Sequence, residues 1–349
     1  MGQGHQASLS VAIMKKIILL ICLQAVWTAG YSQSLPPDMT GGISFQRTNL
    51  VVHWKASKHP WPKTMSVLSM VPTKFSPAVV SNLMALGSFT QTDKTETVQD
   101  RMHMLRFSKD RTGCSFNDTV GVWGYSTQYD FRLNPPTINI PTTNQLSHWA
   151  AEILPKVGIQ LSEIAKDSHG KPKFGFEEYI VYSYPKHTNA ADFVIITNIP
   201  YVEVAFARAV DGVKFYHFDG LGEIDFGEHG EIFRINLEWP DYERLHSYSA
   251  ATPKQIIQWI REGHAKQSHM LQLNGPETVI DWSTVKSLTI TNAAAYYEAE
   301  FFDWIRLERP IFPSYARPFA ELSGTVDTGT TNLFVVIRCP VIDENKPLK

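Results

Sequence analysis

The sequence has little cysteine and no excess of charge of either sign. Only 3 of its 349 residues are cysteine, and 32 lysines and arginines stand against 34 aspartates and glutamates, for a net charge of −2. Because there is no basic excess to neutralise phosphates, we expect no nucleic-acid partner. The absence of CxxC pairs and cysteine–histidine clusters argues against a structural zinc site. Hydrophobic residues make up 43% of the chain, which indicates a folded protein rather than a disordered one.

The signatures of several common catalytic sites are also missing. The sequence contains no HExxH, GxSxG, GxxxxGK or EF-hand pattern, and no GxGxxG follows an expected strand. We therefore expect no cofactor, and no motif identifies a catalytic residue. These absences remove the simplest enzyme classes and leave others open.

A short, largely apolar run lies near the N-terminus. Two lysines precede this run, which covers residues 17–27, and three small residues follow it. This order is typical of a secretory signal peptide, and the run is shorter than the roughly 20 residues of a membrane-spanning helix. We predict an upstream extension over 1–13 and a signal peptide over 14–32, with retention as an anchor as the alternative. We expect the cleaved protein to have no stable membrane span and to be either secreted or located in the periplasm or cell envelope.

Two cysteines, Cys114 and Cys339, remain after removal of the signal peptide. Two cysteines in an exported chain can form one disulfide, which would tie the last strand to the first unit of the fold. Two buried free thiols are the alternative, because unpaired cysteine is common in hydrophobic cores.

Three segments combine a helix-capping start with an apolar stripe. They open at Ser76-Pro77, Thr143-Asn144 and Thr252-Pro253, and a glycine lies at or near the end of each. The apolar spacing of three and four residues predicts one buried face per helix. The residues expected on these faces are Val80, Leu83 and Met84; Trp149, Ile153 and Leu154; and Ile256, Trp259 and Ile260.

Most of the remaining sequence has the character of β-strands. Strands are expected over 174–184, 201–210, 213–218, 223–226, 231–239, 285–291, 296–307 and 333–341, with a long proline-containing loop between the last two and a frayed tail over 343–349. Helices that are each followed by several strands predict an α+β fold with antiparallel sheets, each covered on one face by a helix. We divide the chain into units over 33–140, 141–250 and 251–349.

One stretch of the middle unit resembles a known type of module. Residues 208–215 (RAVDGVKF) match the phrase R-x-x-D-G-v-x-v of PepSY-like and thermolysin-type propeptide modules, and residues 230–232 (GEI) match the G-x-I of their later hairpin. These modules have cystatin-like folds. The resemblance implies tandem cystatin-like units, no catalytic residues, and a role in inhibiting, chaperoning or regulating a partner.

The densest group of ionisable residues lies between 217 and 231 and includes Asp219, Glu223 and Asp225. Strand alternation places Glu223 and Asp225 on one face. Carboxylates near histidines suit a metal site or an acid–base pair. Acidic residues on the wet face of a hairpin are also ordinary solubility devices, so we expect alanine at these three positions to cost little stability and to abolish no chemistry.

Aromatic residues gather in pairs near the C-terminus, at 296–297 and 301–304. Adjacent residues of a strand point to opposite faces, so one of each pair leaves the core unless both faces are covered. Packing between units explains such residues, and a partner or ligand groove is the alternative. The candidate interface residues are Tyr297, Phe302 and Trp304.

These patterns together predict a secreted or envelope-located, non-catalytic binding or regulatory protein that acts on an unidentified protein or small ligand. A secreted hydrolase or metal-binding protein that uses the carboxylates of the 219–231 hairpin is one alternative. A structural component of a surface assembly is another. A stable partner in a pull-down supports the first reading, whereas turnover or metal retention supports the second.

Overall fold

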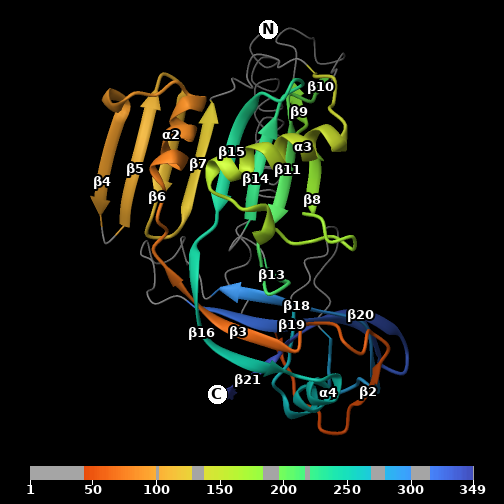
Figure 1. The fold of residues 1–349 in the computed structure, drawn as a ribbon. Coiled ribbons are helices and arrows are strands. Elements are labelled where there is room, and N and C mark those ends of the chain that lie inside the picture. The colour runs from red at the N-terminus through yellow and green to blue at the C-terminus, as the bar shows by residue number, and fades with distance from the viewer. Residues whose placement is uncertain are drawn as a thin grey trace, which may run out of the picture.

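A computed structural model describes residues 43–99, 102–127, 137–183, 196–216, 221–268, 280–299 and 315–348. The expected extension and signal peptide lie outside these ranges, as do Asp219, Phe302 and Trp304. Within them, two large sheets and three α-helices make up most of the structure, as Figure 1 shows. Antiparallel strand pairs dominate both sheets, which confirms the expected α+β class in its broad form. None of the described helices has both the length and the apolar composition needed to cross a bilayer.

The smaller sheet has eight strands in the order β4-β5-β6-β7-β15-β14-β11-β8. They are β4 (Lys94–Gln99), β5 (Met102–Lys109), β6 (Thr112–Asn117), β7 (Val122–Thr127), β8 (Phe174–Glu178), β11 (Val202–Ala207), β14 (Leu221–Phe226) and β15 (Ile232–Glu238). Helix α2 (Pro77–Leu86) precedes the first four strands, and α3 (Thr143–Ile153) precedes the other four. The last strands of the two halves, β7 and β15, pair at the centre of the sheet.

The larger sheet has eleven strands and is covered on one face by α4 (Pro253–Glu262). Its strands are β1 (Ile43–Ser44), β2 (Val51–Trp54), β3 (Thr64–Val71), β12 (Ala209–Val210), β13 (Val213–Phe215), β16 (Asp241–Ala250), β17 (Lys266–Gln267), β18 (Ser287–Ala299), β19 (Tyr315–Asp327), β20 (Asn332–Pro340) and β21 (Ile342–Pro347). β18 runs parallel to β2 and β13. A separate pair is formed by β9 (Val181–Ser183) and β10 (Ile196–Asn198).

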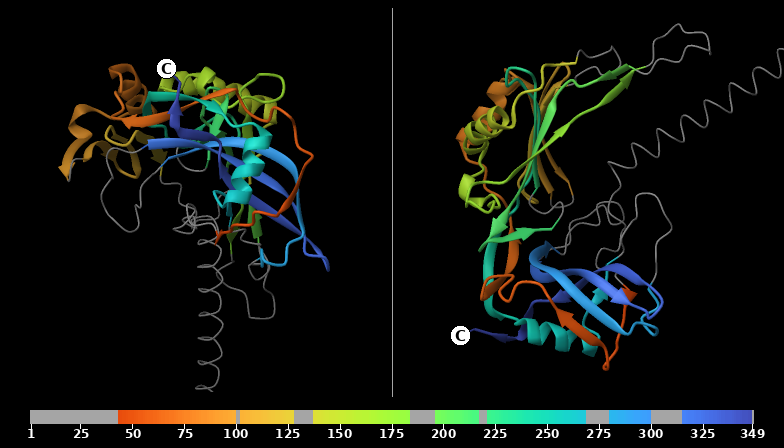
Figure 2. Two further views of the ribbon diagram at one scale, coloured as in Figure 1. Left: turned by 90° about the horizontal axis from the view of Figure 1, so that it is seen from below. Right: turned by 90° about the vertical axis from the view of Figure 1, so that its right-hand side faces the viewer.

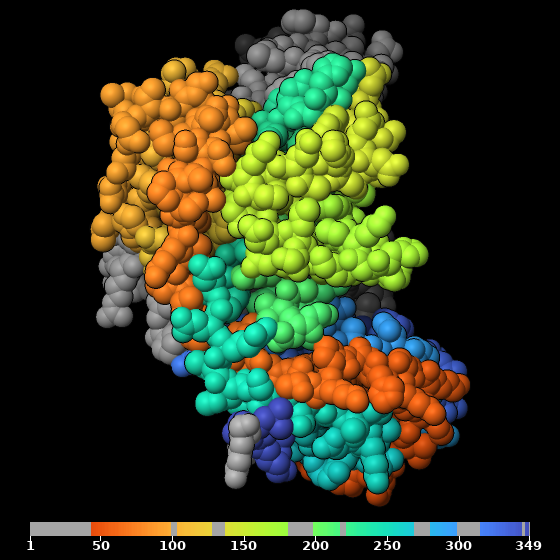
Figure 3. All heavy atoms as spheres, in the orientation of Figure 1, coloured from red at the N-terminus to blue at the C-terminus, as the bar shows by residue number. Residues whose placement is uncertain are grey.

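Each sheet takes strands from more than one of the three units expected from the sequence. The N-terminal strands β1–β3 lie in the larger sheet with the C-terminal strands β16–β21. Figure 3 shows the residues near 50, in red-orange, on the same lobe as α4, in teal. The hairpin β12–β13 leaves the middle unit in the same way and joins the larger sheet. The boundaries at 140 and 250 therefore do not separate the two sheets.

The three expected helix starts are confirmed. Ser76, Thr142 and Thr252 each precede a helix, and each side chain accepts a hydrogen bond from a backbone N–H three residues later. The second helix thus begins one residue earlier than its expected opening. These caps satisfy N–H groups that have no partner within the helix, which is why short polar residues mark the starts.

The expected apolar stripes are confirmed in part. Fully buried positions are Leu83, Leu154, Ile256 and Ile260. The other expected residues, Val80, Met84, Trp149, Ile153 and Trp259, are partly buried and pack against the same cores. They lie at the margins of the apolar faces, where a side chain keeps one side in contact with solvent.

Three expectations near the C-terminus are wrong. β18 is one strand of 13 residues through most of the region where two strands were expected, and β19 forms where a loop was expected. β21 forms where a frayed tail was expected and pairs with β16. In β19, Gly324 faces a bulge of β18, and a Cβ there would clash with the carbonyl oxygen of Thr289. The glycine therefore permits close strand approach and does not end the strand.

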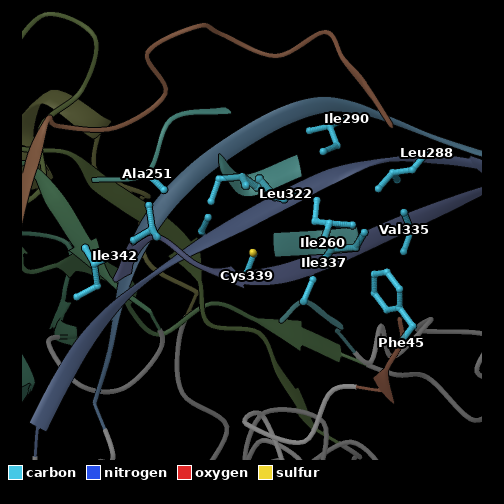
Figure 4. Close-up of a cluster of buried hydrophobic side chains, with 14 of the residues drawn as sticks. Phe45, Ala251, Ile260, Leu288, Ile290, Leu322, Val335, Ile337, Cys339 and Ile342 are labelled. Atoms are coloured by element: carbon cyan, nitrogen blue, oxygen red, sulfur yellow. The ribbon is translucent and has the colours of Figure 1, made fainter. Parts of the chain in front are cut away.

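The Cys114–Cys339 disulfide is not formed in the structure. Both cysteines are free and buried. Cys114 lies in the core of the smaller sheet, whereas Cys339 lies in the core of the larger sheet beside Ile337 and Ile260, as Figure 4 shows. Burial raises the pKa of each thiol to about 12, so both resemble the buried free thiols of the alternative reading.

Candidate functional site

The face of the smaller sheet that no described helix covers carries a group of charged side chains. On β11, Val204 points into the core below α2 and α3, so Glu203 points to the opposite face. On β14, Ile224 lies in the core, and Glu223 and Asp225 share the opposite face, as expected from alternation. The right-hand view in Figure 2 shows α2 and α3 on the other side of this sheet and α4 below the larger sheet.

Strand register brings together residues that lie far apart in the sequence. Glu203 faces Asp225 across β11 and β14, and Asp225 faces Arg234 across β14 and β15. Glu223 and Glu238 follow along the same face. We call Glu203, Glu223, Asp225, Arg234 and Glu238 the acidic face. The sequence hypothesis contained only Glu223 and Asp225 of this set, because the other three lie on strands outside or at the end of the hairpin.

Arg234 is the centre of the acidic face and contacts three carboxylates. Its Nε donates to Oδ2 of Asp225 at 2.8 Å, and its Nη2 donates to Oε2 of Glu203 at 2.9 Å. Nη2 also lies 3.4 Å from Oε2 of Glu223. The planar guanidinium presents several N–H groups at once, so one cation can orient carboxylates from two neighbouring strands.

The acidic face is less hydrated than the sequence led us to expect. The side chain of Asp225 is 3% exposed, that of Glu203 is 22% exposed and that of Glu223 is 29% exposed. The expectation of acidic residues on the wet face of a hairpin is therefore wrong for Asp225. The physical reason is that Asp225 belongs to a central strand, where side chains of the strands on both sides exclude water.

This burial has electrostatic consequences. Burial raises the pKa of Glu203 to about 7 and that of Asp225 to about 6, with Arg234 opposing the shift and Glu223 adding to it. Burial raises the pKa of Glu238 to about 7 as well, and Glu223 again adds to the shift. Ionisation of these three carboxylates is thus less favourable in the folded protein than in water.

The arrangement of the acidic face does not resemble a metal centre. Among the side chains that the structure describes, no three His, Cys, Asp or Glu residues lie where they could hold one ion. In the acidic face, the guanidinium of Arg234 occupies the position between the carboxylates. Chemically, the face can hold protons near neutral pH or receive a further positive group at its margin.

The two neighbouring tyrosines of β18 point to opposite faces of the strand, as expected from alternation. Tyr297, which was expected at an interface, is the one that faces the core. Tyr297 is fully buried in the core of the larger sheet, where its hydroxyl accepts a hydrogen bond of 3.3 Å from the N–H of Ser66. It cannot contact a partner. Its neighbour Tyr296 lies on the other face of β18, with ring centroids 5.4 Å from Tyr216 and 5.9 Å from Phe319.

Arg338 of β20 lies against these aromatic rings. Its guanidinium carbon is 4.2 Å from the ring centroid of Tyr216 and 5.0 Å from that of Phe319. Nη1 of Arg338 also contacts Oε1 of Glu298 at 3.0 Å. This cation–π cluster stabilises the face of the larger sheet opposite α4 and already contains its own cation.

Comparisons with known proteins add little about function. No protein-family model matches the chain, and no curated protein matches it. The structure is similar to the crystal structure of an uncharacterized protein from Eubacterium rectale, with 8% sequence identity and a TM-score of 0.45. That similarity covers 85% of this chain and 89% of the other. A likeness at this level carries no argument about activity or partners.

Proposed function

We propose that this protein is a secreted or envelope-located, non-catalytic binding protein that holds a cationic partner on its acidic face. The observation that carries the proposal is the crowding of partly buried carboxylates around one arginine. Glu203, Glu223 and Asp225 share Arg234, and burial makes the ionised forms of Glu203 and Asp225 costly to keep. A further positive group would lower that cost, and residues that oppose stability are more often kept for function.

The proposal that the protein regulates the partner it binds is supported by the arrangement of its helices and strands. Each half of the smaller sheet consists of one helix and four antiparallel strands. We take these halves as tandem cystatin-like units, in line with the PepSY-like phrase at 230–232, which joins β14 to β15, whereas the phrase at 208–215 forms the β12–β13 hairpin of the larger sheet. Modules of this kind typically act by binding a partner. Export through the signal peptide at 14–32 belongs to the same proposal.

A hydrolase remains the second candidate, because Glu203 has a pKa of about 7 beside Asp225 with a pKa of about 6. Two carboxylates with raised pKa values suit acid–base catalysis at neutral pH. Binding is favoured over catalysis because Arg234 already engages both side chains. A role in a surface assembly has no comparable observation behind it.

The proposal is tested with pentalysine and pentaglutamate as probes in titration calorimetry at low salt. We expect pentalysine to bind at pH 7.5 and pentaglutamate not to bind. The double variant Glu203→Gln/Glu238→Gln should weaken pentalysine binding about tenfold, since two attractive charges are lost. Glu152→Gln, an exposed change on α3, is the matched control and should leave binding unchanged.

Equal binding to the wild type and the double variant would contradict the proposal. So would turnover of a hydrolysable substrate by the purified protein that disappears in Glu203→Gln, because that result assigns the carboxylates to catalysis. A thermal melt of each variant checks that lost binding is not lost folding.

A further inference from the structure

The smaller sheet ends in two edge strands that differ in character. Within the described ranges, β4 pairs only with β5 and β8 pairs only with β11, and Figure 1 shows them at opposite edges. An edge strand directs every second residue's N–H and C=O groups away from the sheet, where another strand can bind them. The two edges can therefore be compared directly within one sheet.

Edge strand β4 has the features that block pairing with another chain. Its sequence, KTETVQ, is polar except for Val98. Lys94 and Glu96 form an ion pair with N–O distance 3.0 Å, and Glu96 also contacts His103 of β5. Charged residues on an edge make the addition of an apolar strand unfavourable.

Edge strand β8 instead exposes large apolar side chains. Every residue from 175 to 180 is exposed. Phe176 is 37% exposed, and the residues directly after the strand continue the pattern, with Tyr179 at 43% and Ile180 at 44%. Exposed aromatic and aliphatic residues beside a free strand edge are typical of a binding site.

The two faces of β8 present different side chains, and each carries one glutamate. Phe176 faces Val204 of β11 on the side of the sheet covered by the helices. Glu177 faces Glu203 on the other side, so the row Glu203–Asp225 of the acidic face continues outward to the sheet edge. A strand added to β8 would therefore meet Phe176 and then Glu178 on the face covered by the helices, and Glu177 on the other face.

We infer that β8 receives an extended, cationic segment of a partner protein as an added strand, in which basic and apolar residues alternate. This inference rests on the proposed function and specifies its partner. Alternation puts the basic side chains beside Glu177, with Glu203 one strand further in, and the apolar ones beside Phe176. Backbone hydrogen bonds supply affinity, and the two faces of the strand supply specificity.

A second copy of this chain fits the edge less well. Antiparallel self-pairing centred on Glu177 places Glu177 opposite itself, and pairing centred on Glu178 places Glu178 opposite itself. Like charges directly opposite each other destabilise a strand pair. Centres at Gly175 and Phe176 avoid this contact. Charge complementarity therefore favours a basic partner over self-association.

The test uses the full chain and two peptides of the same composition. The first peptide alternates valine and lysine over nine residues, and the second has its valines and lysines in separate blocks. We expect the alternating peptide to bind more tightly, since only it can present one charge type per face. Hydrogen exchange should show protection of β8 amides on binding, with β4 amides unchanged.

Variants at the two edges complete the test. Phe176→Lys and Glu177→Lys should each weaken binding of the alternating peptide about tenfold. Val98→Lys places the same residue on the other edge, β4, and should leave binding unchanged. Because all three positions are on edge strands, thermal melts should agree among the variants.

Several results would overturn the inference. If both peptides bind equally well, β8 does not select an alternating strand. If Val98→Lys weakens peptide binding as much as the β8 variants do, β8 is not the binding edge. If the wild type is a dimer without peptide and Phe176→Lys is a monomer, the β8 edge binds a second copy of this chain instead. If Glu203→Gln/Glu238→Gln weakens binding and the β8 variants do not, this inference fails while the proposed function stands. If neither the double variant nor the β8 variants weaken binding, both the inference and the proposed function fail.

Discussion

Arg234 and Asp225 face each other across β14 and β15, and Nε of Arg234 lies 2.8 Å from Oδ2 of Asp225. Replacing Asp225 with alanine removes the most buried of the three carboxylates around Arg234. We expect a loss of about 1–3 kcal/mol in the free energy of unfolding, less than for an isolated buried pair because Glu203 and Glu223 remain. Urea denaturation measures this loss. Glu223→Ala, at a more exposed position, is the control, and equal effects of the two changes would contradict the burial argument.

Stability should depend on pH through the same carboxylates. Their folded-state pKa values are raised to about 6 or 7, above the unfolded values near 4, so the folded protein binds protons more tightly. Their contribution therefore favours folding at low pH and is lost as the pH rises through about 6–7. We expect unfolding free energy to fall by on the order of 2 kcal/mol from pH 5 to pH 8.

Denaturation curves at several pH values check this prediction. The double variant Glu203→Gln/Glu238→Gln should flatten the profile between pH 5 and pH 8 because it removes two of the three titrating groups. A wild-type profile that rises over this interval, or one that the double variant leaves unchanged, would place the titrating groups elsewhere.

Arg208 connects the two sheets and should be important for stability. It is buried, its guanidinium carbon lies 5.5 Å from the ring centroids of both Trp239 and Tyr242, and Nη1 donates to the carbonyl of Pro240. Arg208→Met should cost about 2–4 kcal/mol, and Arg208→Lys should restore little, because an ammonium cannot reproduce the planar contacts. Arg106→Met on β5 is the exposed control. The prediction is wrong if chemical denaturation shows that Arg208→Met lowers the free energy of unfolding by less than Arg106→Met does.

The apolar face of α4 should depend more on Ile260 than on Trp259. Ile260 is fully buried, and Trp259 is only partly buried. We expect Ile260→Ala to cost about 2–4 kcal/mol, as core deletions do, and Trp259→Ala to cost about 1 kcal/mol. Thermal melts of the two variants decide the order. The reverse order would show that Trp259 contributes more to the buried face than Ile260 does.

Neither cysteine should react in the native protein. Burial raises the pKa of Cys114 and Cys339 to about 12, and the reactive form of cysteine is the thiolate. A thiol reagent should label both residues in denaturant without reductant and neither one in buffer. Two thiols that stay unlabelled in denaturant until a reductant is added would show a disulfide.

The sequence alone determined the local structure. Ser76 and Thr252 begin helices because their side chains bind the first free N–H groups, which involves only residues three positions away. The Asp211-Gly212 hairpin follows in the same way, since both residues adopt positive φ, 54° and 79°, and β12 pairs with β13. Alternation also showed that Glu223 and Asp225 share a face.

Only the tertiary structure decided which strands are neighbours and which face is buried. Alternation separates Tyr296 from Tyr297 but does not say which of them enters the core, and the packing of the larger sheet buries Tyr297. The meeting of Glu203 with Arg234 likewise depends on β11, β14 and β15 lying side by side. Strand pairing is a non-local choice, made by the packing of distant segments, so residue patterns within one segment cannot determine it.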